Sequence, residues 1–284
     1  MGTVLTGIVP DDPSITSIYG GANRFLQSFV SRAHPRNGWG LVALALPRFA
    51  RLTRQPRELL SPLIPDFLVY CERLGPGLWA EPVNLVSNVA FVVAGVWALD
   101  RCRRRGLGWS HSEIWLLSLL IVAIGAGSAL WHSFHTGWAE RLDVLPILVF
   151  IHLYLCSFLY RQVGLSMLVS AGVTLSFFAA SKVFAGVTDP GLLNGSVFYL
   201  PALIALAFLA GWSCVRQVPA ARTMIVALLI FIASLVFRTL DAELCGSVPT
   251  GTHFLWHLLN ALVLGLLVGV LTRSPSAADT ENRG

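Results

Sequence analysis

Residues 125–143 read GAGSALWHSFHTGWAERLD and join the end of one long apolar run to the beginning of the next. The stretch contains Ser128, His132 and Asp143, whose side chains can exchange protons or bind metal ions. Ser128 and His132 are four residues apart, so they share one face of a helix, one turn from each other. Asp143 follows at the start of the next apolar run. Polar side chains are costly in hydrocarbon, so this cluster predicts a functional site at a membrane boundary.

The composition of the whole chain is that of a membrane protein. Of its 284 residues, 55% are hydrophobic and only 12% are charged, whereas soluble domains carry roughly 25% charged residues. We therefore expect an all-α fold, an integral membrane bundle of helices. The net charge of +5 is typical of arginines in cytoplasmic loops and does not indicate binding to nucleic acid.

The sequence divides into three parts. Residues 1–65 form an N-terminal extension rich in Arg, Pro and Gly, and they favour either an interfacial segment around 38–47 or a dispensable tail. Residues 66–272 are the expected seven-transmembrane domain, followed by a short cytoplasmic tail at 273–284. An apolar run of about 20 residues is long enough to cross a bilayer. We place seven such runs at 82–100, 113–132, 143–160, 164–187, 196–214, 223–241 and 253–272.

The arginines orient this bundle. Connections on one side of the predicted spans are enriched in arginine, which is typical of the cytoplasmic side. The residues concerned are Arg101, Arg103, Arg104, Arg105, Arg161, Arg216, Arg222 and Arg273. The C-terminus is then cytoplasmic, and the ends of spans that carry the polar cluster face outward. Arginine in place of lysine, with abundant Ala and Gly, favours a bacterial inner membrane.

A second histidine motif lies at the predicted start of the last span. His253 and His257 are four residues apart and present two imidazoles on one helix face, the geometry that zinc requires. Such pairs also arise from core packing, but the topology places both at the depth of His132. Three histidines leave a fourth tetrahedral position open, as in catalytic zinc sites. The sequence therefore predicts a zinc ion held by His132, His253 and His257.

Two further residues have candidate catalytic roles. A carboxylate beside an activated water can act as a general base, and Asp143 is in position to do so if the second and third spans are neighbours. Its alternative role is to cap the third span. The hydroxyl of Ser128 can donate to an oxyanion, although a small residue beside Gly125 and Gly127 also suits helix packing. His135 is an alternative ligand or an outer neighbour of the site.

The remaining histidines and the cysteines have simpler interpretations. His111 and His152 fall on the cytoplasmic side or within a span and are expected to be structural. Cys71 and Cys245 are both predicted outside the membrane, where an oxidising compartment favours a disulfide between them. Cys102, Cys156 and Cys214 are expected to remain thiols.

These patterns resemble those of the alkaline ceramidases, which belong to a superfamily of seven-span zinc hydrolases that includes adiponectin-receptor-like proteins. The resemblance rests on SxxxH followed by Asp143 and on HFLWH in the last span. It extends to the lead-in from Tyr70 to Asn88 and to RTLDAELC before the last loop. It covers about residues 66–272 and implies the same roles for the residues named above, including the disulfide. It also implies that Glu72 and Glu81 supply carboxylates to a calcium ion, although Val69 stands where an acidic residue is expected.

The resulting hypothesis is a zinc-dependent amidohydrolase that cleaves the amide bond of ceramide-like lipids to a fatty acid and a sphingoid base. Its substrate would come from the bilayer. One alternative keeps this chemistry but changes the lipid, because ceramide is scarce in many bacterial membranes. A third hypothesis is a receptor or transporter with a structural metal site, but broken helices and internal repeats, which are common in transporters, are not evident.

Overall fold

A computed structural model describes residues 70–73 and 75–273 of the chain. The N-terminal extension expected at 1–65, with its interfacial segment at 38–47, lies outside the described residues. The same holds for the C-terminal tail beyond Arg273.

Within the described part, seven helical segments are long and apolar enough to cross a membrane, so the chain is an integral multi-pass membrane protein. All seven predicted spans are confirmed, with ends that differ by a few residues. The helices are α2 (Pro82–Ser87) continued by α3 (Val89–Arg104), α4 (Ser112–Phe134) after the short η3 (Trp109–His111), α5 (Gly137–Phe158) continued by η4 (Leu159–Val163), α6 (Met167–Val187), η5 (Leu192–Tyr199) continued by α7 (Leu200–Val215), α8 (Ala221–Leu244) and α9 (His253–Leu271).

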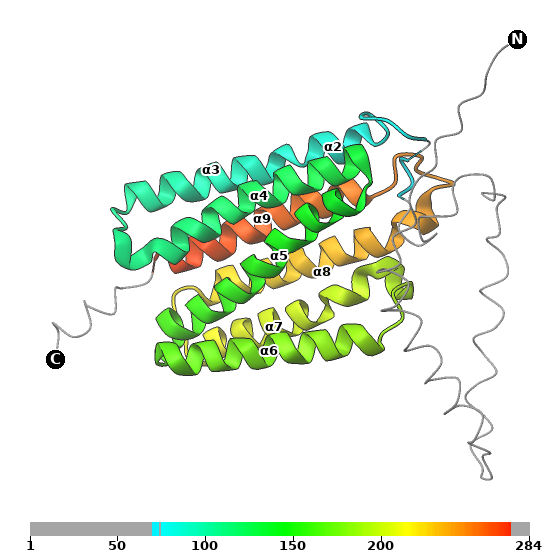
Figure 1. Cartoon of the computed structure of the whole chain (residues 1–284). Coiled ribbons are helices and arrows are strands. Elements are labelled where there is room, and N and C mark those ends of the chain that lie inside the picture. The colour runs from blue at the N-terminus through cyan, green and yellow to red at the C-terminus, as the bar shows by residue number, and fades with distance from the viewer. Residues whose placement is uncertain (1–69, 74, 274–284) are drawn as a thin grey trace, which may run out of the picture. The chain divides into compact units, whose positions relative to one another are not determined.

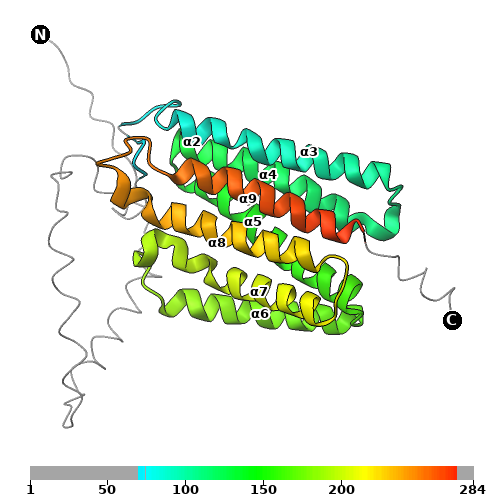
Figure 2. The same ribbon diagram turned by 180° about the vertical axis from the view of Figure 1, so that it is seen from behind.

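The helices run side by side along one direction (Figure 1), and the view from behind shows α9 and α8 between α3 and α7 (Figure 2). Helix α3 packs on α4 and α9, α8 packs on α9 and α7, and α5 packs on α4 and α6. Helix α9 is the most central, since 61% of its apolar window is buried inside the protein, against 6% for α6. The exposed apolar side chains of α6 therefore face lipid.

Helices α4 and α5 approach each other very closely at the end that carries the polar cluster. A Cβ atom added at Gly127 would overlap the carbonyl oxygen of Leu142, so only glycine allows this contact. Two residues connect the helices, and the first, His135, adopts a left-handed conformation with φ 49°. This tight connection brings the first turns of α5 against the last turns of α4.

The structure changes one expectation about Asp143. Helix α5 begins at Gly137, with Thr136 as its N-cap residue, so Asp143 lies well inside the helix and does not cap it. Residues 133–142, which lie between the second and third predicted spans, are mostly helical. The apolar pattern marks the membrane-embedded part of a helix and not its full length.

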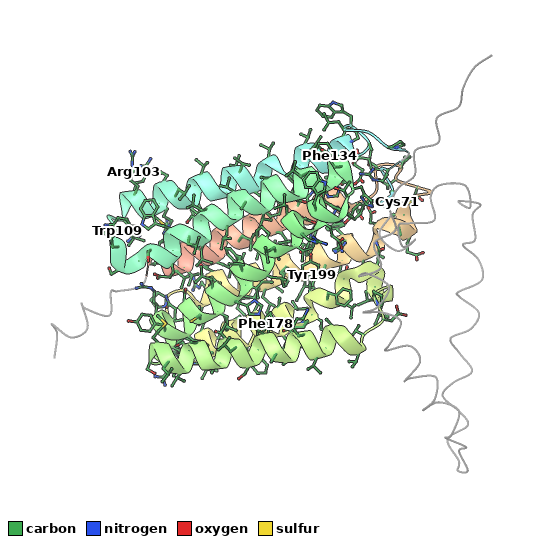
Figure 3. The ribbon with its side chains drawn as sticks, viewed as in Figure 1. Cys71, Arg103, Trp109, Phe134, Phe178 and Tyr199 are labelled. Atoms are coloured by element: carbon green, nitrogen blue, oxygen red, sulfur yellow. A yellow bond between two sulfur atoms is a disulfide. The ribbon has the colours of Figure 1, made fainter. Side chains whose placement is uncertain are left out.

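The two ends of the bundle differ in chemistry. Figure 3 shows Arg103 at one end and Cys71 at the other, and Phe134 lies at the same end as Cys71. Since α4 ends and α9 begins at this end, the residues singled out in the sequence gather there.

Candidate metal centre and active site

Three buried histidines from two helices converge at this end. His132 comes from the last turn of α4, and His253 and His257 come from the first turns of α9. One nitrogen of each ring lies within 4.8 Å of the corresponding nitrogens of the other two. Each residue is at most 3% exposed. Buried imidazole nitrogens need partners, because buried polar groups are costly when unsatisfied.

A chain of polar contacts orients the ring of His132. Its Nδ1 lies 2.5 Å from Oε2 of Glu81, whose side chain is completely buried. The other carboxylate oxygen of Glu81 accepts a hydrogen bond from Nε of Arg73 at 2.5 Å, and Arg73 also donates to the carbonyl oxygen of His132 at 2.8 Å. A carboxylate that accepts from one ring nitrogen leaves the other free to bind a metal ion.

The charges around Glu81 also set its protonation. Burial alone would raise the pKa of Glu81, but the hydrogen bond and charge of His132 and the charge of Arg73 more than offset it and hold the pKa below its ordinary value. Glu81 is therefore an anion in the folded protein. A carboxylate anion fixes the proton of His132 on Nδ1 and raises the basicity of Nε2.

The two histidines of α9 are held differently. The Nδ1 atom of His257 lies 2.7 Å from the hydroxyl of Ser87, so its Nε2 points to the centre of the group. His253 packs on the ring of Tyr70, with ring centroids 4.0 Å apart. Its Nδ1 is buried and has no hydrogen-bond partner among the described residues. A buried nitrogen without a hydrogen-bond partner, beside two oriented imidazoles, is available to bind a metal ion.

The arrangement fits zinc. Two nitrogens bound tetrahedrally at 2.0–2.1 Å from one zinc ion are separated by ~3.3 Å, and Nε2 of His132 lies 3.2 Å from Nε2 of His257. Three neutral nitrogen ligands also match the preference of zinc for imidazole. This buried group therefore has the composition and spacing to hold a metal ion such as zinc.

Ser128 and Asp143 border the same site. Both line a cavity of about 550 Å³ together with His253 and His257. The hydroxyl of Ser128 lies 3.5 Å from Nε2 of His257, one helical turn below His132. Asp143 reaches the cavity from α5 because Gly127 lets the backbone of α5 approach α4. A carboxylate and a hydroxyl thus face the space next to the three histidines.

A second, apolar cavity adjoins the first. It lies between α5 on one side and α7, α8 and α9 on the other, with an empty volume of about 770 Å³ that includes space open to the outside. It is lined by side chains such as Phe150, Leu206, Phe231 and Leu264. The two cavities share Phe91, Ile124, Ile147, Tyr199 and Trp256. A polar cavity beside an apolar one suits a ligand with a polar group at one end and a hydrocarbon chain at the other.

A model of the Ceramidase family matches residues 74–281. This match covers most of the chain and includes every span. The chain belongs to the Ceramidase family. A search of curated proteins finds no match. The resemblance seen in the histidine motifs is thereby confirmed at the level of the family.

In this member of the Ceramidase family, a disulfide and a buried carboxylate hold the end of the bundle that carries the histidines. Cys71 is bonded to Cys245, with Cα atoms 5.2 Å apart. Asp241 accepts hydrogen bonds from the backbone N–H groups of Thr252 and His253 at 2.6 and 2.9 Å, and from that of Cys71 at 3.2 Å. Asp241 therefore caps α9 at its first residue, and a negative charge is favourable at a helix N-terminus.

The two carboxylates assigned to calcium by resemblance are both engaged with protein groups. Glu72 accepts from the backbone N–H groups of Val83 and Asn84 at 2.6 and 2.8 Å, which caps α2. The carboxylate of Glu81 forms hydrogen bonds with the side chains of Arg73, His132 and Asn84. A calcium ion would have to replace these bonds, and calcium binding stays a prediction.

The other histidines and cysteines lie apart from the three-histidine group. His135 stacks on Trp131 with ring centroids 3.9 Å apart, and His152 in the middle of α5 faces Phe177 and Phe178 of α6. His111 belongs to η3, near the other end of the bundle. Among the described cysteines, those outside the disulfide are free, namely Cys102, Cys156 and Cys214.

Sequence reasoning missed several residues around the site. Arg73, Ser87 and Arg238 received no role, and Asp241 was noted only as part of the family resemblance. Ser87 and Arg238 do carry a signal, since a polar side chain inside a predicted span must find a partner. Which partner it finds depends on the rotation of each helix, which hydropathy does not specify.

Proposed function

We propose that this chain is a zinc-dependent amidohydrolase that cleaves the amide bond of ceramide-like lipids to a fatty acid and a sphingoid base. The observation that carries this proposal is the buried group of His132, His253 and His257, with Asp143 in the cavity that His253 and His257 line. Membership of the Ceramidase family supports the reaction class. The adjoining apolar cavity supports a substrate with a long hydrocarbon chain.

The histidines would hold the zinc ion, with Glu81 and Ser87 fixing the rings of His132 and His257. When bound, zinc supplies Lewis acidity, which makes water nucleophilic near neutral pH and polarises a carbonyl. Asp143 accepts the proton that the attacking water loses and returns a proton to the nitrogen of the leaving amine. The hydroxyl of Ser128 donates to the carbonyl oxygen as negative charge develops on it.

The position of the cavities suits a substrate that arrives from the bilayer. Apart from Tyr70, the residues that line them belong to the candidate membrane spans. The acyl chain would occupy the apolar cavity and the amide would lie beside the histidines. By the distribution of arginines, this end of the bundle lies on the outer side of the membrane and the C-terminus lies in the cytoplasm.

The test measures metal content and lipid-amide hydrolysis on the same purified samples. His132→Ala should lose both zinc and hydrolysis. Asp143→Asn should keep zinc but lose roughly 100- to 10,000-fold in turnover, the usual contribution of a general acid–base group. His152→Ala is the matched control, since it removes a histidine of α5 away from the three-histidine group. Full hydrolysis by His132→Ala, or a zinc-loaded wild-type protein that cleaves no lipid amide, would contradict the proposal.

The identity of the lipid is tested separately. A set of amides with one acyl chain and different amine groups, including ceramide and N-acyl amino acids, should be offered to the wild-type protein. Preferential cleavage of ceramide supports the proposed substrate. Preferential cleavage of another amide supports the alternative of a different N-acyl lipid.

A further inference from the structure

Arg238 is a buried cation in the wall of the polar cavity. It lies on α8, one turn before Asp241, and is 8% exposed. The same cavity is bordered by His253, His257 and Asp143. A guanidinium inside a membrane span is expensive and marks a functional position by default.

Aromatic side chains surround the guanidinium of Arg238, and no carboxylate of the described residues forms an ion pair with it. The rings of Tyr199 and Trp256 each lie 5.6 Å from its Cζ atom, which favours the charge through cation–π contact. The guanidinium forms a hydrogen bond with the side chain of Tyr70. Among the described residues its Nε has no hydrogen-bond partner and Arg238 belongs to no ion pair. The cavity also contains Asp143 and Glu140, but neither forms an ion pair with Arg238.

The turn before α7 is shaped around this side chain. Residues 193–195 all adopt positive φ values, and a Cβ atom at Gly195 would lie 3.4 Å from a terminal nitrogen of Arg238. The side chain of Asn194 donates to the carbonyl oxygen of Arg238 at 3.3 Å. The chain therefore departs from regular helix at this point, and Gly195, whose positive φ favours glycine, lies next to the guanidinium.

The chemistry of the guanidinium selects its ligand. An arginine presents several N–H donors in a planar fork that matches the two oxygens of a carboxylate. An uncharged lipid amide has no such group, whereas hydrolysis of the amide creates one on the fatty acid. An N-acyl lipid with an acidic head group would carry one from the start.

We propose that Arg238 binds a carboxylate in the polar cavity, supplied either by the released fatty acid or by an acidic head group on the N-acyl lipid. The inference rests on the proposed function for its choice of lipid, while the binding itself requires no turnover. Fatty acids should then occupy the cavity more tightly than uncharged lipids of equal chain length and slow further cleavage.

The test compares three probes with one chain: palmitate, N-palmitoylglycine and palmityl alcohol. Binding to the purified zinc-loaded protein is followed by the fluorescence of Trp131 and Trp256, which line the cavity, and by calorimetry. Arg238→Gln should weaken binding of an acidic probe roughly 10- to 100-fold, as expected for hydrogen bonds to a charged group, and leave the alcohol unchanged. Arg222→Gln, an exposed arginine near the other end of α8, is the matched control.

The pattern of losses identifies the source of the carboxylate. If Arg238→Gln weakens the binding of palmitate alone, the carboxylate comes from the released fatty acid. If it weakens the binding of N-palmitoylglycine alone, the carboxylate belongs to an acidic head group. If it weakens both, the site accepts either carboxylate. Arg238→Lys keeps the positive charge but loses the planar pair of N–H donors, so it should lose an intermediate part of the affinity. It replaces Arg238→Gln in the test if the glutamine variant does not fold.

Two results would overturn the inference. The first is unchanged binding of both acids by Arg238→Gln or by Arg238→Lys. The second is an equal loss of binding for the alcohol, which would indicate a structural role for Arg238, such as balancing the charge of Asp143. Carboxylate binding that persists in a protein unable to cleave any lipid amide would reject the proposed function and leave this site standing.

Discussion

Replacing Glu81 by glutamine should weaken zinc binding while leaving the three histidines in place. Glutamine has the same shape as glutamate but no charge, and the carboxylate it replaces is completely buried between His132 and Arg73. Without the anion, the proton of His132 is no longer fixed on Nδ1, so the imidazole loses its orientation and part of its basicity toward the metal.

The substitution should have two separate effects. Partners of this kind usually contribute 10- to 100-fold to metal affinity, so we expect the zinc dissociation constant to rise by about that factor. The folded protein should also lose stability, because Arg73, whose side chain is only 12% exposed, keeps its charge without its partner. Breaking a buried ion pair typically costs about 3–5 kcal/mol.

The assay is a zinc titration of metal-free protein in detergent against a chromophoric chelator, with thermal unfolding of the same samples. Glu72→Gln is the matched control, because Glu72 is also a buried carboxylate at this end of the bundle. Within the described part of the chain, its hydrogen bonds come from backbone N–H groups of α2. It should reduce stability without changing zinc affinity. The reasoning is refuted if Glu81→Gln binds zinc as the wild type does, or if Glu72→Gln weakens zinc binding equally.

Three further predictions concern stability. Gly127→Ala should lower the free energy of unfolding by at least ~3 kcal/mol or prevent folding, because the added Cβ would overlap a backbone atom of α5 that cannot move aside. Gly172→Ala is the control, since its Cβ would meet open space in α6. Thermal unfolding should show it to be neutral or slightly stabilising. Cys245→Ser should lower the free energy of unfolding by about 2–5 kcal/mol, since the disulfide closes a loop of 174 residues, and reductant should affect only the wild type. Burial, and after it the charge of Arg73, lower the pKa of His135 from 6.5 to about 4. The neutral imidazole therefore contributes its full stability above pH 6.5, and this contribution is lost as the pH falls toward 4. His135→Gln should reduce this loss of stability in acid, and a pH profile of unfolding equal to that of the wild type would contradict the prediction.

Much of the architecture follows from local sequence. Seven apolar runs of spanning length predict seven helices, because backbone groups in hydrocarbon must bond within their own segment. The parity of the spans then predicts that His132 and His253 lie at the same end of the bundle. The spacing of His253 and His257 places both rings on one helix face. These inferences need only helix geometry and the thickness of a membrane.

The immediate environment of the histidines was decided by tertiary packing. Glu81 precedes α2 and meets His132 of α4 only because the two helices pack together, so nothing local distinguishes it from a calcium ligand. Arg73 looks like any charged residue before a first span, yet its guanidinium completes the contacts of Glu81.

The stretch at 125–143 shows the same division. Its residues alone indicate a polar cluster between two helices, but the point at which α5 begins and the direction in which Asp143 faces depend on the contact at Gly127. Hydrophobic periodicity determines that a helix forms and how deep each residue lies. The rotation of each helix about its axis, and therefore which polar groups meet, is determined by close packing between helices, where differences of less than an ångström decide the outcome.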